Sequence, residues 1–232
     1  MFSSPLSKFS KPWRITVSWI ATLLVPVVLL FIALRIVASD FFLDVEYRLP
    51  HFPVDSYGFT TAQRLEYASL CLRYLNTNAD IRLLADLTFE NGSPLFNARE
   101  LSHMEDVKAV FVPVTNIGLG LTLILFGLLL VAQRRPWRAD VIAGIRRGAW
   151  LTLGLIAIIG IFAAVSFWTF FESFHALFFE GDSWMFLYSD TLIRLFPLQF
   201  WQDAVTWLVA IVGGLSLILA LFLKPGQKAP AH

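Results

Sequence analysis

Four long apolar segments constrain the fold of this chain more than any other feature. Each is almost free of charge and long enough to cross a hydrocarbon core of about 30 Å, which takes about 20 helical residues. Hydrophobic residues make up 57% of the chain and charged residues only 15%, a balance outside the usual range of soluble domains. The sequence therefore predicts an all-α membrane protein. The four predicted transmembrane helices are Thr16–Ala38, Val110–Ala132, Ala149–Phe171 and Ala204–Leu223.

Lysine and arginine gather in three of the segments outside these spans. These three segments contain a single acidic residue, Asp140, so by the positive-inside rule all three face the cytoplasm. Both termini are then cytoplasmic, and the other two connections are extracellular. The basic residues are Lys8, Lys11 and Arg14 in the N-terminal tail, Arg134, Arg135, Arg138, Arg146 and Arg147 in the loop after the second span, and Lys224 and Lys228 in the C-terminal tail.

The spans divide the chain into five predicted segments. The first span is interpreted as an uncleaved helix and not a signal peptide, because its apolar stretch is longer than a typical signal-peptide core. Residues 1–38 form a cytoplasmic tail and the first transmembrane helix, 39–109 an extracellular cap, 110–171 the second and third transmembrane helices with their basic loop, 172–203 an aromatic-rich extracellular loop, and 204–232 the fourth helix and its tail.

The cap is predicted to be small and mainly helical. Thr60 is followed three residues later by Gln63, and Asn97 by Glu100, which is the spacing of a capping box at a helix start. The second of these helices includes His103. A short helix over residues 80–87 and a hairpin at the Asn91-Gly92 turn complete the prediction.

Two histidines lie close to the ends of apolar segments, on the same predicted side of the membrane. His103 stands in "ELSHMEDVK" and His175 in "FESFHALFFEGDSW". Imidazole has the side-chain pKa closest to neutral pH, so the pair is a candidate for proton transfer. Glu100 and Asp106 lie one helical turn to either side of His103 and are expected to orient its ring. The alternative is an interfacial His103 among solvated acids and a structural His175.

Aromatic residues are dense between positions 167 and 201. An interfacial aromatic belt explains some of them, whereas an apolar pocket for acyl chains explains why the density is confined to one predicted face. Both interpretations stay open. On the pocket interpretation, the candidate substrate-binding residues are Trp184, Phe179, Phe174, Tyr57 and Arg35; the last of these could instead pair with a cap carboxylate.

Other chemistries find little support in the sequence. No HExxH or comparable spacing occurs, so we expect no metal site, and no nucleophile elbow is present. No basic patch resembles a nucleic-acid footprint, and Cys71 is the lone cysteine. The spans have no charged residue near the membrane centre, which disfavours a transporter.

The motifs resemble a bacterial family of four-span membrane proteins, the lipoprotein intramolecular transacylases. The resemblance rests on "YGF", "RLEYASLCLRYLN", "LFNARELSHMEDVK", "FHALFFEGDSWMF" and "DTLIRLFPLQFWQD", in that order. It implies that His103 and His175 are catalytic, in an enzyme of the bacterial cytoplasmic membrane. It also implies that the enzyme moves the sn-2 acyl chain of a diacylglyceryl-cysteine lipoprotein onto that lipoprotein's own N-terminal amine, without a cofactor.

Two functions of different classes are therefore open at this point. The leading one is this acyltransferase, with membrane lipids around it and a diacylated lipoprotein as substrate. In it His103 acts as general base, and His175 stabilises the oxyanion or protonates the leaving oxygen. The alternative is a non-catalytic accessory subunit that packs into a larger, heteromeric membrane complex through the same aromatic surface.

Overall fold

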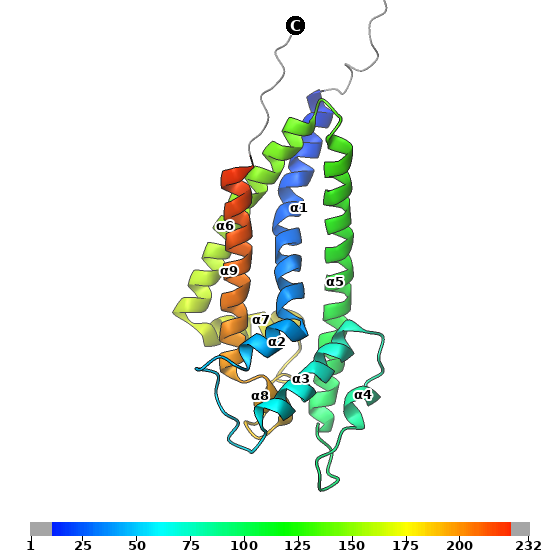
Figure 1. The fold of residues 1–232 in the computed structure, drawn as a ribbon, viewed down its shortest axis with the longest axis vertical. Helices are drawn as coiled ribbons and strands as arrows, with labels where there is room; N and C mark the ends of the chain where they lie inside the picture. The colour runs from blue at the N-terminus through cyan, green and yellow to red at the C-terminus, as the bar shows by residue number, and fades with distance from the viewer. Residues whose placement is uncertain (1–10, 224–232) are drawn as a thin grey trace, which may run out of the picture. The chain divides into compact units, whose positions relative to one another are not determined.

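The chain folds as an all-helical protein. The computed structural model describes residues 11–223, and within them the only strand-like pairing is an isolated bridge between Thr88 and Pro94. Four helices, α1, α5, α6 and α9, are long and apolar enough to cross a membrane, so the predicted fold class is confirmed. The helices in Figure 1 are α1 (Lys11–Val37), α2 (Asp40–Glu46), α3 (Thr61–Asn76), α4 (Arg82–Ala85), α5 (Ala98–Ala132), α6 (Arg138–Val165), α7 (Phe167–Phe178), α8 (Thr191–Leu195) and α9 (Leu198–Phe222).

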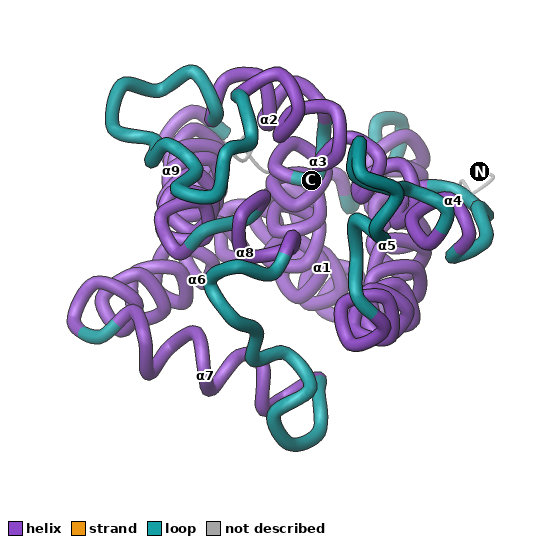
Figure 2. The backbone as a smooth tube through the Cα atoms, turned by 90° about the horizontal axis from the view of Figure 1, so that it is seen from below, coloured by secondary structure: helices purple, strands orange, loops and turns teal. Residues whose placement is uncertain are grey.

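The third long helix ends earlier than the sequence predicts. The predicted span reaches Phe171, but α6 stops at Val165 because Ser166 leaves the helical conformation, with φ −150° and ψ 88°. A separate helix, α7, begins at the next residue and carries His175. Figure 2 shows α7 running across the direction of the first half of α5. The break is invisible to hydropathy because the chain stays apolar on both sides of it.

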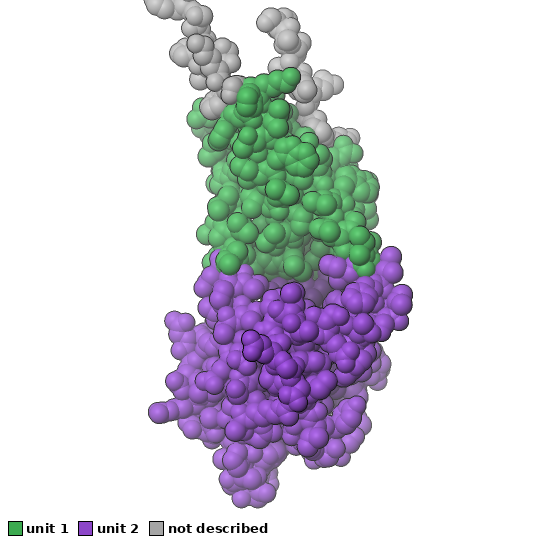
Figure 3. All heavy atoms as spheres, turned by 180° about the vertical axis from the view of Figure 1, so that it is seen from behind, with its two compact units in different colours: residues 1–32, 117–158, 209–232 green, residues 33–116, 159–208 purple. Residues whose placement is uncertain are grey.

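The helices belong to two compact units (Figure 3). Unit 1 comprises residues 1–32, 117–158 and 209–232, and unit 2 comprises 33–116 and 159–208. In unit 1 the backbones of α1 and α6 come into close contact at glycines. A Cβ atom on Gly144 would clash with the backbone carbonyl oxygen of Ser18. Small residues permit this close packing between membrane helices.

Unit 2 has a core of its own. The core joins α3 and α4 to the first turns of α5 and to α8, so it fixes the start of the helix that carries His103. The predicted capping box at Thr60 is present, and Gly92, with φ 81°, turns the predicted hairpin. The buried core residues are Cys71, Tyr74, Leu84, Leu95, Phe96, Met104, Leu192 and Leu195.

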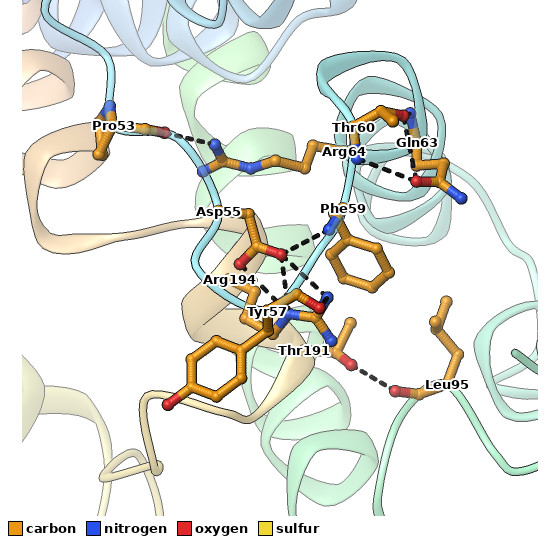
Figure 4. A network of polar contacts seen from close by, with 10 residues as sticks. All are labelled: Pro53, Asp55, Tyr57, Phe59, Thr60, Gln63, Arg64, Leu95, Thr191 and Arg194. Atoms are coloured by element: carbon orange, nitrogen blue, oxygen red, sulfur yellow. Dashed lines mark hydrogen bonds and ion pairs between the residues drawn. The ribbon is translucent and has the colours of Figure 1, made fainter.

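A buried ion pair connects the loop before α3 to α8. Figure 4 shows Arg194 beside Asp55, with Nη2 of the arginine 2.9 Å from Oδ2 of the carboxylate; the two side chains are 8% and 3% exposed. The guanidinium also lies 3.5 Å from the centre of the Phe59 ring. Burial by itself raises the pKa of Asp55, but hydrogen bonds from Arg194 and the Phe59 amide outweigh burial, so the pKa is lowered.

Breaking this pair should destabilise the protein strongly. Replacing Asp55 with asparagine leaves a buried guanidinium without its counter-charge, which costs about 3–5 kcal/mol in comparable sites. The matched control is Asp44→Asn, which removes an exposed pair with Arg48 and should change the free energy of unfolding by less than about 1 kcal/mol. Unfolding in detergent measures both. Similar small losses in the two variants would contradict a structural role for the Asp55–Arg194 pair.

Candidate functional site

His103 lies in the second turn of α5, directly after the capped start of that helix. The backbone N–H of Asn97 donates to Oε2 of Glu100 at 2.8 Å, which confirms the predicted capping box. The other oxygen, Oε1, accepts from the Leu192 backbone N–H at 2.7 Å. Glu100 is fully buried. Its carboxylate therefore binds two backbone amides, at the starts of α5 and α8, and does not orient the His103 ring as the sequence predicts.

Aromatic packing holds the His103 ring. Its centroid lies 5.1 Å from the Phe179 ring and 5.3 Å from the Phe186 ring. Nδ1 is buried and has no hydrogen-bond partner among the described residues. Asp106, the other predicted orienting residue, is exposed. The half-buried ring therefore retains hydrogen-bonding capacity that the protein does not use.

His175 lies on α7 and is held by its own helix. Nδ1 is 2.7 Å from the backbone carbonyl oxygen of Phe171. Because a carbonyl only accepts, Nδ1 carries the proton and Nε2 of the neutral ring is the acceptor. Burial lowers the pKa of His175 more than this hydrogen bond raises it. The ring is therefore neutral at neutral pH. Neutral His175 therefore contributes fully to the stability of the fold above pH 6.5, the ordinary histidine pKa. This contribution is lost as the pH falls through the lowered pKa of His175 in the folded protein.

The Phe179 ring brings the two histidines into one site. Its centroid is 5.1 Å from that of His103 and 5.8 Å from that of His175. The Trp184 ring packs against His175 with the ring centroids 4.4 Å apart, and Phe174 lies 5.6 Å from the same ring. Three of the predicted substrate-binding residues thus surround the histidine pair, all within unit 2.

Arg99 fixes the loop that carries Trp184. From the first turn of α5, its guanidinium donates to the backbone carbonyl of Asp182. It also lies 5.7 Å from the centre of the Phe186 ring. Gly181, with φ 62°, supplies the left-handed turn that the loop requires. The loop is therefore attached to the same helix as His103.

Two predicted substrate-binding residues lie elsewhere in unit 2. Arg35, in the last turn of α1, donates to the side-chain oxygen of Asn76 on α3, a polar partner that takes the place of the carboxylate considered above. Tyr57 lies in the loop before α3, where its carbonyl accepts from Arg194 at 3.3 Å (Figure 4). Both residues contribute contacts that hold unit 2 together.

Sequence analysis missed two aromatic residues of the site. Phe171 lies 4.1 Å from the His175 ring, and its position four residues before His175 on a helix was a usable signal. Phe186 packs on His103. No local pattern marks it, because loop 180–186 and α5 are far apart in the sequence.

These features define a class: an integral membrane protein with two histidines in an aromatic site, where burial lowers the pKa of each. The model of the Lit family, "lipoprotein intramolecular transacylase Lit", matches residues 18–201. The chain belongs to this family. A protein of Aquifex aeolicus (strain VF5), described only as uncharacterized, is 34% identical over 213 residues, which cover 90% of this chain and 93% of that protein.

Solved structures support the fold. The membrane integral lipoprotein intramolecular transacylase of Bacillus cereus has a TM-score of 0.70 at 18% identity, with 90% of this chain and 94% of that chain covered. A variant of the same protein with one histidine replaced by arginine has a TM-score of 0.67 at 16% identity, with 90% of each chain covered. At these identities the likeness concerns the fold alone.

Trp184 should control the protonation of His175. The tryptophan is 9% exposed and covers the imidazole, so Trp184→Ala should admit water and move the pKa of His175 up toward the ordinary value of 6.5. Leu177→Ala, at a 75% exposed position on the same helix, should leave it unchanged. NMR titration of histidine-labelled protein, with His175→Ala to assign the signal, measures both. An unchanged pKa in Trp184→Ala would contradict the shielding.

Proposed function

We propose that this protein transfers the sn-2 acyl chain of a diacylglyceryl-cysteine lipoprotein to that lipoprotein's own N-terminal amine, producing the lyso form. The observation that carries the proposal is that both histidines pack against Phe179, in a member of the lipoprotein intramolecular transacylase family. The same membership favours an acyltransferase over an accessory subunit of a larger complex.

The reaction needs two services from the protein. The free α-amino group, with an ordinary pKa of about 7.7–8.0, must lose a proton before its nitrogen attacks the ester carbonyl. The tetrahedral intermediate then develops an oxyanion, and the glyceryl oxygen leaves with a proton as the C–O bond breaks. The substrate carries both amine and ester, so the site chiefly holds them at attack distance.

His175 is the better candidate for the general base. Its hydrogen bond to the Phe171 carbonyl places the ring proton on Nδ1 and leaves the Nε2 lone pair free. The carbonyl also orients the ring, as the third member of a base–orienter set does. Burial keeps the ring neutral and able to accept a proton. This assignment reverses the division of roles expected from the sequence.

His103 then supplies the donor. A buried N–H without a partner is rarer and more costly than a buried acceptor without one. The unpartnered Nδ1 of His103 is therefore best unprotonated, which places the ring proton on Nε2. The Nε2–H group can stabilise the oxyanion, and the glyceryl oxygen can leave with the proton that His175 accepted from the amine. Trp184, Phe179 and Phe174 would flank the acyl ester.

The proposed setting is the bacterial cytoplasmic membrane. Both chain ends would face the cytoplasm because the basic residues gather beside them. The 39–109 cap and the histidine pair would then lie on the extracellular side, where a diacylated lipoprotein exposes its N-terminus. The Phe179 ring and its neighbours would exclude water, which otherwise hydrolyses the ester.

The test is the N-terminal structure of a reporter lipoprotein. Mass spectrometry of a reporter produced with this protein, in a host without other N-acylation, should show the lyso form. His103→Ala and His175→Ala should each lower conversion by about 100-fold or more. Ile158→Ala, at an exposed position of α6, should convert normally. A diacyl N-terminus unchanged by the wild-type protein would refute the function.

Glutamine substitutions separate the two histidine roles. Glutamine keeps an N–H donor but cannot act as a base, so His103→Gln should convert substrate at least about 10-fold faster than His103→Ala. His175→Gln should be as slow as His175→Ala. Initial rates with a purified lipopeptide measure all four variants. Recovery at position 175 and not at 103 would reverse the assignment.

A further inference from the structure

A second group of ligand-type side chains lies where α2 ends and α9 begins. Glu46 is the last residue of α2, His51 lies in the loop that follows, and Asp203 lies in the second turn of α9. One ligand atom from each lies within 4.8 Å of those of the other two. His51 Nε2 is 3.0 Å from Asp203 Oδ2. Three segments of the chain therefore bring a nitrogen and two carboxylates to one point.

Glu46 is the unusual member of this group. Its side chain is fully buried, with 0% exposure. Both carboxylate oxygens lack a hydrogen-bond donor among the described residues, although Asp203 and His51 lie within reach. A buried carboxylate without a partner is costly. The arrangement therefore calls for either a bound cation or a proton on one of the two carboxyl groups.

We propose that Glu46, His51 and Asp203 bind a divalent transition-metal ion, with zinc as the best match. Imidazole nitrogen and carboxylate oxygen are both zinc ligands, and a tetrahedral site separates its ligand atoms by ~3.4 Å. His51 Nε2 and Asp203 Oδ2 are 3.0 Å apart, close to this separation, and all three ligand atoms lie within 4.8 Å of one another. Three protein donors leave one position for water. The metal would hold α2 and its following loop against the start of α9.

A neighbouring amide is placed to orient one ligand. Gln199 Nε2 donates to the two oxygens of Asp203 at 3.1 and 3.0 Å. Outer-shell hydrogen bonds of this kind fix ligating carboxylates in metal sites, and their loss typically weakens metal binding by about 10–100-fold. Gln199 lies one turn before Asp203 on the same helix, so its contribution follows from the sequence spacing.

The competing explanation is a proton shared between the two carboxyl groups. Burial, with a hydrogen bond to Asp203 and repulsion from its charge, raises the pKa of Glu46 to about 8. A protonated Glu46 could donate to Asp203 and satisfy one oxygen without a cation. The two explanations make different demands on the solution: the metal site requires a metal ion in it, whereas the shared proton requires only water.

Metal content and thermal stability distinguish them. The detergent-purified full chain, carrying no polyhistidine tag, is equilibrated with zinc and then with metal-free buffer. The expected result is about one bound zinc per chain. At 100-fold excess over Kd, zinc should raise Tm by about 5 °C or more. Glu46→Gln and Asp203→Asn should bind at least about 10-fold more weakly. Glu46→Gln keeps the shape of the neutral side chain and should fold.

The catalytic candidates provide the control. The double variant His103→Ala/His175→Ala should retain its zinc. The metal site would be refuted by wild-type protein that binds no zinc, or by Glu46→Gln and Asp203→Asn proteins that bind as tightly as the wild type. Loss of zinc in the double variant alone would place the metal at the histidine pair and equally overturn the proposal.

Discussion

The position of His103 depends on the two backbone hydrogen bonds that the Glu100 carboxylate accepts. The carboxylate accepts the Asn97 amide at the start of its own helix and the Leu192 amide at the start of α8. Removing it would leave the buried Leu192 N–H group unpaired, at a cost of about 1–3 kcal/mol, and would also remove the partner of the part-buried Asn97 amide. The carboxylate thereby fixes where α5 begins and which element lies beside it. His103 lies one turn after Glu100, so its place is set by the start of α5.

Local sequence information predicted what depends on local physics. Hydropathy identified the four long helices, and the side-chain spacing of Thr60–Gln63 and Asn97–Glu100 identified two helix starts that the structure contains. The histidine motifs stood out for the same reason, since each lies beside an apolar run. The structure brings His103 and His175 to a common ring, Phe179, which was among the candidates.

What the sequence could not give depends on contacts between distant residues. Glu100 has the right spacing to reach His103, but its second carboxylate oxygen accepts a hydrogen bond from the Leu192 amide instead. No local sequence pattern predicts this contact. The Asp55–Arg194 pair likewise joins positions separated by most of the chain. Ser166 interrupts a run that stays apolar, so composition gives no sign that α6 ends. Each feature that the sequence did not predict is a tertiary contact or a backbone dihedral angle.

The break at Ser166 has a consequence for how the enzyme meets its substrate. α7 crosses the direction of the first half of α5 (Figure 2), and its apolar residues Trp168, Phe174 and Leu177 are exposed beside the buried His175. The proposed function would place this exposed apolar helix in the plane of the membrane interface. Encounter is then a search in two dimensions. The quantity that sets the rate is the mole fraction of lipoprotein among the lipids, and diluting the bilayer with inert lipid is equivalent to withholding substrate.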